Sequence, residues 1–280
     1  MSRTLPPIAL TLIGIGTGNP DHLTRQAMRA MCMADLILLP HKGEDKAELA
    51  ALRQSLCDAV LADTPAPPRV AGFDMPVRRS QGDDYLAQVD EWHTAITACW
   101  QATMAQALAN GLQPRQTDGC LHVALLVWGD PSLYDSTLRI AARMQPAPVQ
   151  VQVVAGITAV QALTAAHALA VNEIGQPFTV TTGRQLRDHG WPTGVDTVVV
   201  MLDGQCSFTS LPPVLAQEVD IWWGAYVGMT QQVLDHGPLS EAGPRILAAR
   251  AAARAQHGWI MDIYLLRRRS VVALDSARHI

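Results

Sequence analysis

The 280-residue sequence is poor in charged side chains, at 16%, and in aromatic side chains, at 5%. Its formal net charge is −4, so the chain as a whole offers no electrostatic support for nonspecific binding to nucleic acid. No apolar run reaches the roughly 18 residues that a membrane-spanning helix needs. These shortages predict a protein whose partner is neither a nucleic acid nor a membrane.

Cysteine and histidine are present, but without the spacings of a structural or metal site. The five cysteines include no C-x-x-C pair, and the nine histidines include no H-x-x-H or H-x-x-x-H pair. We therefore expect neither a disulfide framework nor a bound metal. The first apolar stretch runs directly into a glycine-rich segment, unlike a secretory signal, so we expect a cytoplasmic location with reduced thiols.

Three glycines at alternate positions, Gly14, Gly16 and Gly18, follow an apolar run over residues 8–13. A helical pattern comes after them, with Thr24 as its expected N-cap. In open α/β sheets, a strand, a glycine turn and a helix build a ligand crevice at the carboxyl ends of the strands. The spacing differs from the dinucleotide fingerprint G-x-G-x-x-G, and residues 40–42 (Pro-His-Lys) stand where an acidic residue would bind a ribose. The pattern therefore predicts a crevice for a small ligand other than NAD.

Apolar runs and helical patterns alternate over the first 155 residues, which predicts a mainly parallel sheet. Beyond residue 175 several candidate strands alternate in polarity, as in a sheet with one exposed face. A helix is expected over residues 207–217. The sequence therefore predicts an α/β protein of two domains, residues 1–155 with a mainly parallel sheet and residues 156–280 with a mixed sheet.

Two further segments, residues 128–134 and 153–159, also place a glycine just after a strand-like run. Because the carboxyl ends of parallel strands meet at one edge of a sheet, three such turns can surround one small ligand. Asp130 has an alternative, purely structural interpretation. Since Pro131 suits a first helical turn, Asp130 could be the N-cap of the next helix.

The three turns together resemble the motifs of the tetrapyrrole methylases, the S-adenosylmethionine-dependent enzymes of cobalamin and sirohaem synthesis. Residues 14–24 match the family pattern G-x-G-x-G-[DN]-P-x-x-L-T, residues 129–134 match G-D-P-x-x-[YF], and residues 153–159 match V-x-P-G-[IV]-[ST]-[AS]. The chain departs from the family at three positions. Ala155 and Thr17 stand where proline is usual or frequent, and Trp128 where many relatives have glycine.

The resemblance implies a tetrapyrrole substrate, a homodimer, and a ligand cleft between the two domains. It implies S-adenosyl-L-methionine as cofactor and S-adenosyl-L-homocysteine as its product. By motif position, the cofactor contacts would come from Gly16, Thr17, Gly18, Trp128, Gly129, Asp130, Leu133, Thr158, Ala159, Met201 and Gly228.

Residues 39–49, 128–137 and 178–184 make the match closest to the family members that act on a ring-contracted precorrin. The resemblance then implies methylation of precorrin-5 at C1 with release of acetate, giving precorrin-6A. The methyl donor is already activated, so the protein mainly orients the reactants and removes water.

Loss of the acetyl group needs an activated water and stabilisation of charge. His41, Glu44, Asp45 and Asp130 are the candidate groups, and the sequence does not select among them. Our hypothesis is that His41 or Asp45 assists this step, because both follow a strand, so that Asp130, His41 and Asp45 are the candidate catalytic residues.

The substrate carries several carboxylates, so arginines should bind it. Arg184, after a strand of the second domain, is the first candidate, and Tyr134 is a second expected substrate contact. Arg78 and Arg79 are further candidates.

Three other functions stay open at this point. The chain could methylate another tetrapyrrole or precorrin, or a macromolecule such as ribosomal RNA, although its acidity disfavours RNA. It could also be a nucleotide-binding module without chemistry. Binding of S-adenosylhomocysteine but not NAD would separate the methyltransferases from that module.

Overall fold

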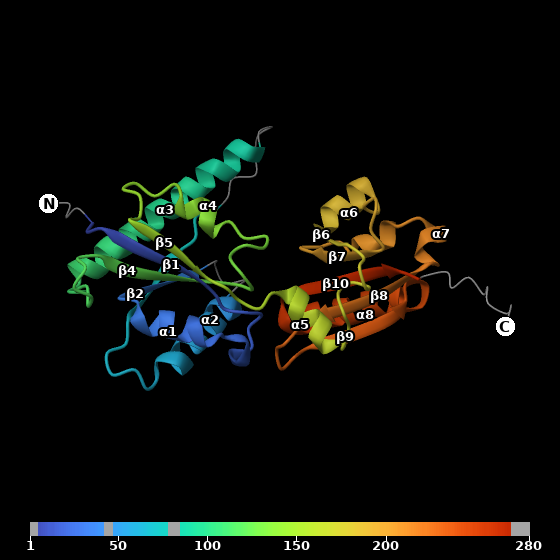
Figure 1. Cartoon of the computed structure of the whole chain (residues 1–280), viewed down its shortest axis with the longest axis horizontal. Coiled ribbons are helices and arrows are strands. Elements are labelled where there is room, and N and C mark those ends of the chain that lie inside the picture. Colours follow the sequence, from blue (N-terminus) through green and yellow to red (C-terminus); the bar gives the residue numbers. More distant parts are fainter. Residues whose placement is uncertain (1–4, 42–46, 78–84, 270–280) are drawn as a thin grey trace. The chain divides into compact units, whose positions relative to one another are not determined.

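The computed structural model describes residues 5–41, 47–77 and 85–269. It contains two compact units, Met1–Ala159 and Val160–Ile280 (Figure 1). The predicted domain boundary, between residues 155 and 156, lies just before this division.

The first unit is built on a five-stranded sheet in which every pairing is parallel. Its strand order is β3-β2-β4-β1-β5, so β1 and β4 lie side by side near its middle. The strands are β1 (Ile8–Gly14), β2 (Leu36–His41), β3 (Arg69–Asp74), β4 (Leu121–Val127) and β5 (Gln150–Val154). The helices of this unit are α1 (Arg25–Met33), α2 (Ala47–Leu61), α3 (Tyr85–Ala109) and α4 (Thr137–Ala141).

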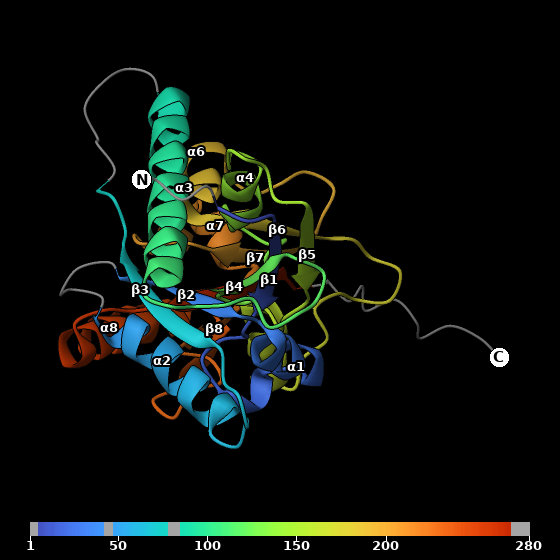
Figure 2. The same ribbon diagram turned by 90° about the vertical axis from the view of Figure 1, so that its left-hand side faces the viewer.

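Both faces of this sheet are covered, which explains why its central strands are continuously apolar. In β2, Leu38 belongs to the core cluster that contains Met104 of α3. Its neighbour Ile37 belongs to the cluster that contains Met31 of α1 and Leu56 of α2. Successive side chains of a strand point to opposite faces, so α3 covers one face and α1 and α2 cover the other (Figures 1 and 2).

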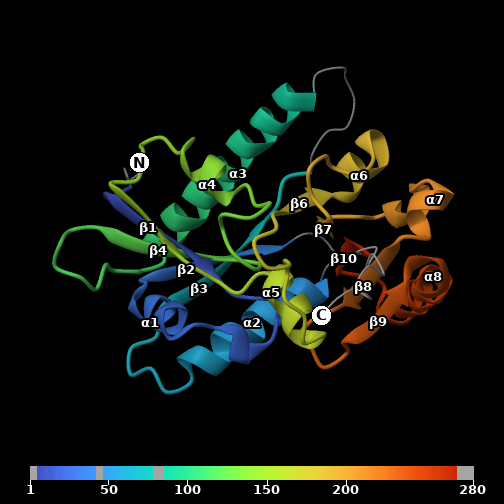
Figure 3. The same cartoon turned by 45° about the vertical axis from the view of Figure 1, so that its right-hand side comes forward.

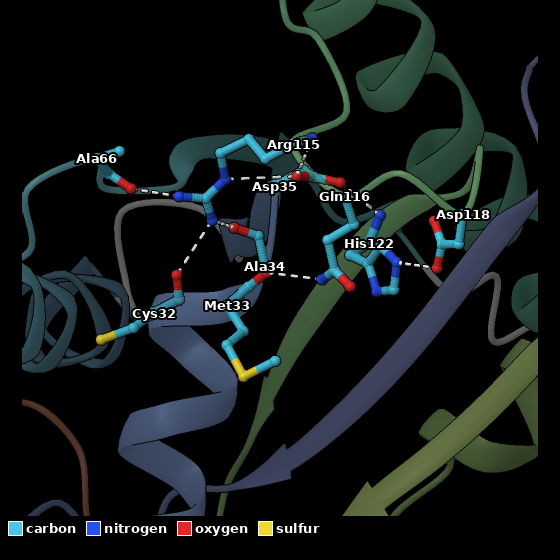
Figure 4. A network of polar contacts seen from close by, with 9 residues as sticks. All are labelled: Cys32, Met33, Ala34, Asp35, Ala66, Arg115, Gln116, Asp118 and His122. Carbon is cyan, nitrogen blue, oxygen red and sulfur yellow. Dashed lines mark hydrogen bonds and ion pairs between the residues drawn. The ribbon is translucent and has the colours of Figure 1, made fainter.

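A buried carboxylate ties together the amino ends of the strands. Asp35, in the turn before β2, accepts hydrogen bonds from the backbone N–H of Arg115 at 2.9 Å and of His122 at 2.8 Å. The Arg115 guanidinium pairs with the same carboxylate and donates to the carbonyl oxygens of Cys32, Ala34 and Ala66 (Figure 4). The α1–β2 turn, the start of β4 and the connection before β3 are thereby held at one edge, opposite the carboxyl ends.

The second unit contains a mixed sheet with the order β6-β7-β10-β8-β9 (Figure 3). β6 and β7 are parallel, and the other pairings are antiparallel. The strands are β6 (Phe178–Thr182), β7 (Thr197–Met201), β8 (Val219–Ala225), β9 (Val233–Pro238) and β10 (Asp262–Arg268). The helices are α5 (Ala159–Ala166), α6 (Gly183–His189), α7 (Pro213–Ala216) and α8 (Leu239–His257). α8 contacts β8 and β9, and α6 contacts β6 and β7.

The predicted α/β class, with one parallel and one mixed sheet, agrees with this structure, but the helix predicted over residues 207–217 is wrong. The chain instead forms a short 3-10 helix, η3 (Ser207–Ser210), and then α7. Pro212 precedes α7 and Pro213 is its first residue, and both lack the N–H groups that a continuous helix needs. Leu211 before them is extended. β9 and α6 were not predicted, because their sequences are short and polar.

Candidate functional site

The turns after β1 and β4 are hydrogen-bonded to each other. Gly16 and Gly129 form an isolated bridge, in which the Gly129 N–H donates to the Gly16 oxygen at 2.7 Å. The Gly16 N–H donates in return to the Gly129 oxygen at 3.3 Å. Gly129 has φ +62°, a conformation that side-chain-bearing residues rarely adopt. The first two predicted turns therefore meet, as expected from the parallel sheet.

The third turn lies against the first two. A Cβ atom on Gly156 would collide with the Gly129 oxygen and would lie 2.8 Å from the Cα of Gly14. A Cβ on Gly129 would come within 3.6 Å of the Cα of Thr158. All three turns thus converge at the carboxyl edge of the first sheet, and Gly156 is needed for the close approach.

Asp130 joins two of these turns through its side chain. Its Oδ2 accepts the backbone N–H of Gly156 at 2.8 Å, and its Oδ1 accepts the N–H and the hydroxyl of Ser132 at 2.8 and 2.5 Å. Partial burial opposes ionisation of this carboxyl, but the hydrogen bonds from Ser132 and Gly156 together lower its pKa. Asp130 is not the N-cap of a helix, because the next helix, α4, begins at Thr137 and Ser136 occupies its N-cap position.

The glycine loop after β1 is held by a side-chain contact. The buried Thr17 shares a hydrogen bond between its hydroxyl and the Nδ1 of His22 at 2.9 Å. Asn19 accepts the N–H of Asp21 at 2.9 Å, and the Thr24 hydroxyl accepts the N–H of Ala27 at 3.0 Å. The predicted N-cap of α1 is therefore confirmed. Thr17, a predicted cofactor contact, has its hydroxyl occupied by His22.

The structure brings together the predicted cofactor residues of the first unit at this edge. They are Gly16, Thr17, Gly18, Trp128, Gly129, Asp130, Leu133, Thr158 and Ala159. Of these, Ala159 is the first residue of α5, and the Leu133 N–H donates to the Asp130 oxygen at 3.2 Å.

The remaining predicted contacts lie in the second unit. Met201 ends β7, and the exposed Arg184 lies in the first turn of α6. Gly228 follows β8, with φ +84°, and its N–H donates to the side chain of Gln232 at 2.7 Å. The contacts of these three residues with a ligand, and the cleft between the domains, stay predictions.

A cavity of about 240 Å³ opens at the carboxyl ends of β2, β3 and β4, beside the segment that follows β4. Two predicted site residues line it, Trp128 and Tyr134. It also contains Arg53 of α2, whose guanidinium lies 4.8 Å from the centroid of the Trp128 ring. Sequence reasoning missed Arg53, because a single arginine on a helix usually faces solvent and no motif surrounds it.

The structure describes some of the candidate catalytic residues and not others. His41 ends β2, and its ring lies where a Cβ on Gly72 of β3 would be. Asp45 lies outside the described residues, as do Glu44, Arg78 and Arg79. Asp130 lies in the turn described above, with both carboxylate oxygens accepting hydrogen bonds.

Metal ligands and cysteine thiols are the other groups in the described residues that could take part in catalysis. No group of three or more His, Cys, Asp or Glu side chains in these ranges could hold a metal ion. Burial, with the nearby charge of Asp58, raises the pKa of the Cys57 thiol to about 12, so this thiol stays protonated. No helix in the same ranges is long and apolar enough to cross a membrane.

Known proteins are similar to this chain over almost its whole length. The family model of the tetrapyrrole (corrin/porphyrin) methylases matches residues 9–243. A precorrin-6A synthase [deacetylating] from Sinorhizobium sp. is 42% identical over 262 residues, which cover 92% of this chain and 95% of the relative.

Solved structures of tetrapyrrole-related proteins are also similar to this chain. A putative cobalamin synthesis related protein (CobF) from Corynebacterium diphtheriae is 36% identical, with a TM-score of 0.73 over 94% of this chain and 99% of that one. The uroporphyrin-III C-methyltransferase of Thermus thermophilus, solved with S-adenosyl homocysteine, is 18% identical, with a TM-score of 0.52 over 92% of each chain, and shows the fold alone. Because the family model spans most of the sequence and its three motifs meet at one edge of the sheet, the chain belongs to the tetrapyrrole methylases.

Proposed function

We infer that the chain acts as a deacetylating precorrin-6A synthase of cobalamin biosynthesis. It transfers a methyl group from S-adenosyl-L-methionine to C1 of precorrin-5 and releases acetate, giving precorrin-6A. The observation that carries this inference is the 42% identity to the Sinorhizobium precorrin-6A synthase, which extends over 95% of that relative.

The edge formed by the three turns fits the methyl donor. Gly129 and Gly156 carry no side chains where the three turns meet, which supports close approach of a nucleoside ligand to the backbone at this edge. The residues that would hold it are those of the first unit named above, together with Met201 and Gly228. When bound, the sulfonium supplies an activated methyl group, so no nucleophilic side chain is needed from the protein.

Within this edge we assign Asp130 a positioning role. Its lowered pKa keeps it ionised at neutral pH, and both of its oxygens already accept hydrogen bonds from the neighbouring turns. A carboxylate in this state orients the Gly129 and Gly156 turns against each other. It is a poor proton carrier for deacetylation, which leaves His41 and Asp45 as our candidates for activating the water.

The substrate is bound, in this proposal, by Arg184 and Tyr134. Tyr134 lines the cavity at the carboxyl edge, and Arg184 is exposed on α6. Arginine suits the carboxylates of a precorrin because its planar guanidinium can donate two parallel hydrogen bonds to one carboxylate.

We further propose a cytoplasmic homodimer. The edge strand β5 supports an interface between copies, because Val151 and Val153 are 44% and 39% exposed on it. Light scattering of the purified chain tests this directly. A mass of one chain at micromolar concentration would contradict it.

Mass spectrometry of an incubation with precorrin-5 and S-adenosyl-L-methionine tests the function. We expect a product that has gained one methyl group and lost its acetyl group, with free acetate in equal amount. A methylated product that keeps its acetyl group would indicate another precorrin methyltransferase. Binding of the cofactor without methylation of any tetrapyrrole would indicate a module without chemistry.

The roles of His41 and Asp45 need separate measurements of the two steps. In His41→Ala and Asp45→Ala, we expect at least one variant to release acetate more slowly while it still binds S-adenosylhomocysteine. Unchanged acetate release in both variants would remove these residues from the mechanism.

A further inference from the structure

Three of the residues that line the cavity at the carboxyl ends of β2, β3 and β4 carry hydrogen-bond donors without a partner among the described residues. They are the Nε of Arg53 and the indole Nε1 atoms of Trp100 and Trp128, all of them buried. Trp92 lines the same cavity and differs from them, because its Nε1 donates to the Pro76 oxygen at 2.7 Å. Buried donors are normally paired, so three unpaired donors on the residues that line one cavity indicate a missing acceptor.

Arg53 is the charged member of this set. The residue is 6% exposed, and no described carboxylate lies within ion-pair distance of it. Within the described ranges, its hydrogen bond runs from Nη1 to the Leu49 oxygen at 3.5 Å, the limit for such a bond. Burial lowers the pKa of this guanidinium to about 10, against the attraction of Asp135, so it is still charged at neutral pH. The guanidinium lies over the Trp128 ring, a cation–π contact that offsets part of the cost of burying its charge. No opposite charge neutralises it within ion-pair distance in the described residues, and an anionic ligand would lower the remaining cost.

The chemistry of the three donors restricts the ligand. An indole N–H and a guanidinium can only donate, so the ligand must offer acceptors. A carboxylate does this with two oxygens and also supplies the charge that Arg53 lacks.

The size and walls of the cavity restrict the ligand further. Its volume of about 240 Å³ lies below the roughly 300–1,000 Å³ of sites for drug-sized molecules, so it suits a small ligand or one side arm of a larger one. Apolar side chains form much of its wall, among them Phe73, Met75, Ile96, Leu125 and Ile140. A short alkyl group would be buried favourably against them.

We propose that this cavity binds a short alkyl carboxylate, with Arg53 pairing with the carboxylate and the indole N–H groups of Trp100 and Trp128 completing its hydrogen bonds. The identity of the natural ligand rests on the proposed function. It is either the acetate that deacetylation releases or an acetate or propionate side arm of the macrocycle.

Asp135 also lines the cavity and opposes an anion there. Its Oδ1 accepts the N–H of Thr137 at 2.6 Å, so its carboxylate is held in place rather than turned away. Asparagine at this position would keep an acceptor for that N–H and remove the charge. Arg53 and Asp135 therefore provide two substitutions with opposite expected effects on the same ligand.

The test is a titration of the full chain with sodium acetate and sodium propionate, against sodium chloride at constant ionic strength. Tryptophan fluorescence and line broadening of ¹³C-labelled acetate report binding. We expect saturable binding that Arg53→Gln weakens roughly tenfold or more, because a charge-assisted pair is lost. Arg53→Lys and Trp100→Phe should weaken it less, and Asp135→Asn should tighten it. Arg254→Gln, at an exposed arginine of α8, is the matched control, and circular dichroism verifies that each variant is folded.

No saturable binding of either carboxylate, or equal binding by folded Arg53→Gln and the original chain, would overturn the proposal. Steady-state assays with precorrin-5 separate the two sources. A side arm is indicated if Arg53→Gln raises KM and acetate competes with the macrocycle. Product acetate is indicated if Arg53→Gln slows acetate release and leaves KM unchanged. If the original chain binds acetate but transfers no methyl group, the proposed function fails and the carboxylate site stands.

Discussion

Single atoms decide whether the three turns can meet. The Cβ of an alanine at position 156 would overlap the Gly129 oxygen and press on the backbone of Gly14. Both contacts are with main chain, which cannot rotate away as a flexible side chain would. The requirement for glycine there comes from space, because no positive φ is involved.

Gly156→Ala should therefore lose about 1–3 kcal/mol of unfolding free energy, as overpacked sites do, and bind S-adenosylhomocysteine much more weakly. Urea unfolding and calorimetric titration measure the two effects. Gly204→Ala is the matched control, because a Cβ at Gly204 meets nothing within 4 Å. Equal stability of the two variants would mean that the turns do not approach as closely as described.

Asp130 should make stability depend on pH. Its folded-state pKa is lowered, so its ionised form is favoured by folding, and the stabilisation is present above the unfolded pKa of about 3.9 and disappears as the pH falls through the folded value. Asp130→Asn should cost about 1 kcal/mol at pH 7, and the difference from the original chain should shrink below about pH 4. Urea unfolding across pH 3 to 7 measures this. A difference that grows on acidification would contradict the assignment.

At the scale of elements, the two edges of the first sheet have different tasks. The carboxyl edge carries the glycine turns, while Asp35 and Arg115 hold the other edge together (Figure 4). The Asp35 side chain is fully buried and accepts two backbone N–H groups, so its removal leaves several donors without a partner.

Asp35→Ala should destabilise the chain by about 3–5 kcal/mol, as expected when one partner of a buried pair is removed. Under conditions where the variant is folded, its affinity for S-adenosylhomocysteine should be unchanged, because the network lies at the opposite edge. Asp63→Ala, at an exposed aspartate, should change stability by less than about 0.5 kcal/mol. A loss of affinity without a loss of stability would contradict this division of tasks.

The elements themselves were predictable where their patterns are long. The strands β1 and β4 and the helix α3 follow from continuous apolar runs or sustained helical spacing. Residues 207–217 were misjudged, since their apolar spacing suits a helix but Pro212 and Pro213 interrupt its hydrogen bonds. β9 lacks a local signal, because it is short and ends in Gly237 and Pro238, and it becomes a strand by antiparallel pairing with β8.

At the scale of the whole molecule, a ligand that binds only the folded chain must stabilise it. S-adenosylhomocysteine at one hundred times its dissociation constant should add about 2.7 kcal/mol to the unfolding free energy and raise the thermal midpoint. NAD at the same concentration should leave the midpoint unchanged, because the loop after β1 lacks the dinucleotide spacing. Differential scanning fluorimetry measures both, and equal shifts by the two ligands would argue for a general nucleotide module.

The sequence by itself determined the family, the two α/β sheets and the positions of the three turns. These depend on local requirements: glycine where backbone segments approach closely, apolar runs where strands are buried, and motifs short enough to recognise. Only the tertiary structure decided that Asp130 joins the Gly129 and Gly156 turns, and that Arg53 of α2 lies over the Trp128 ring with no ion-pair partner among the described residues. The energy of a buried charge depends on neighbours that are far apart in the chain, so no pattern around Arg53 could reveal its burial against Trp128.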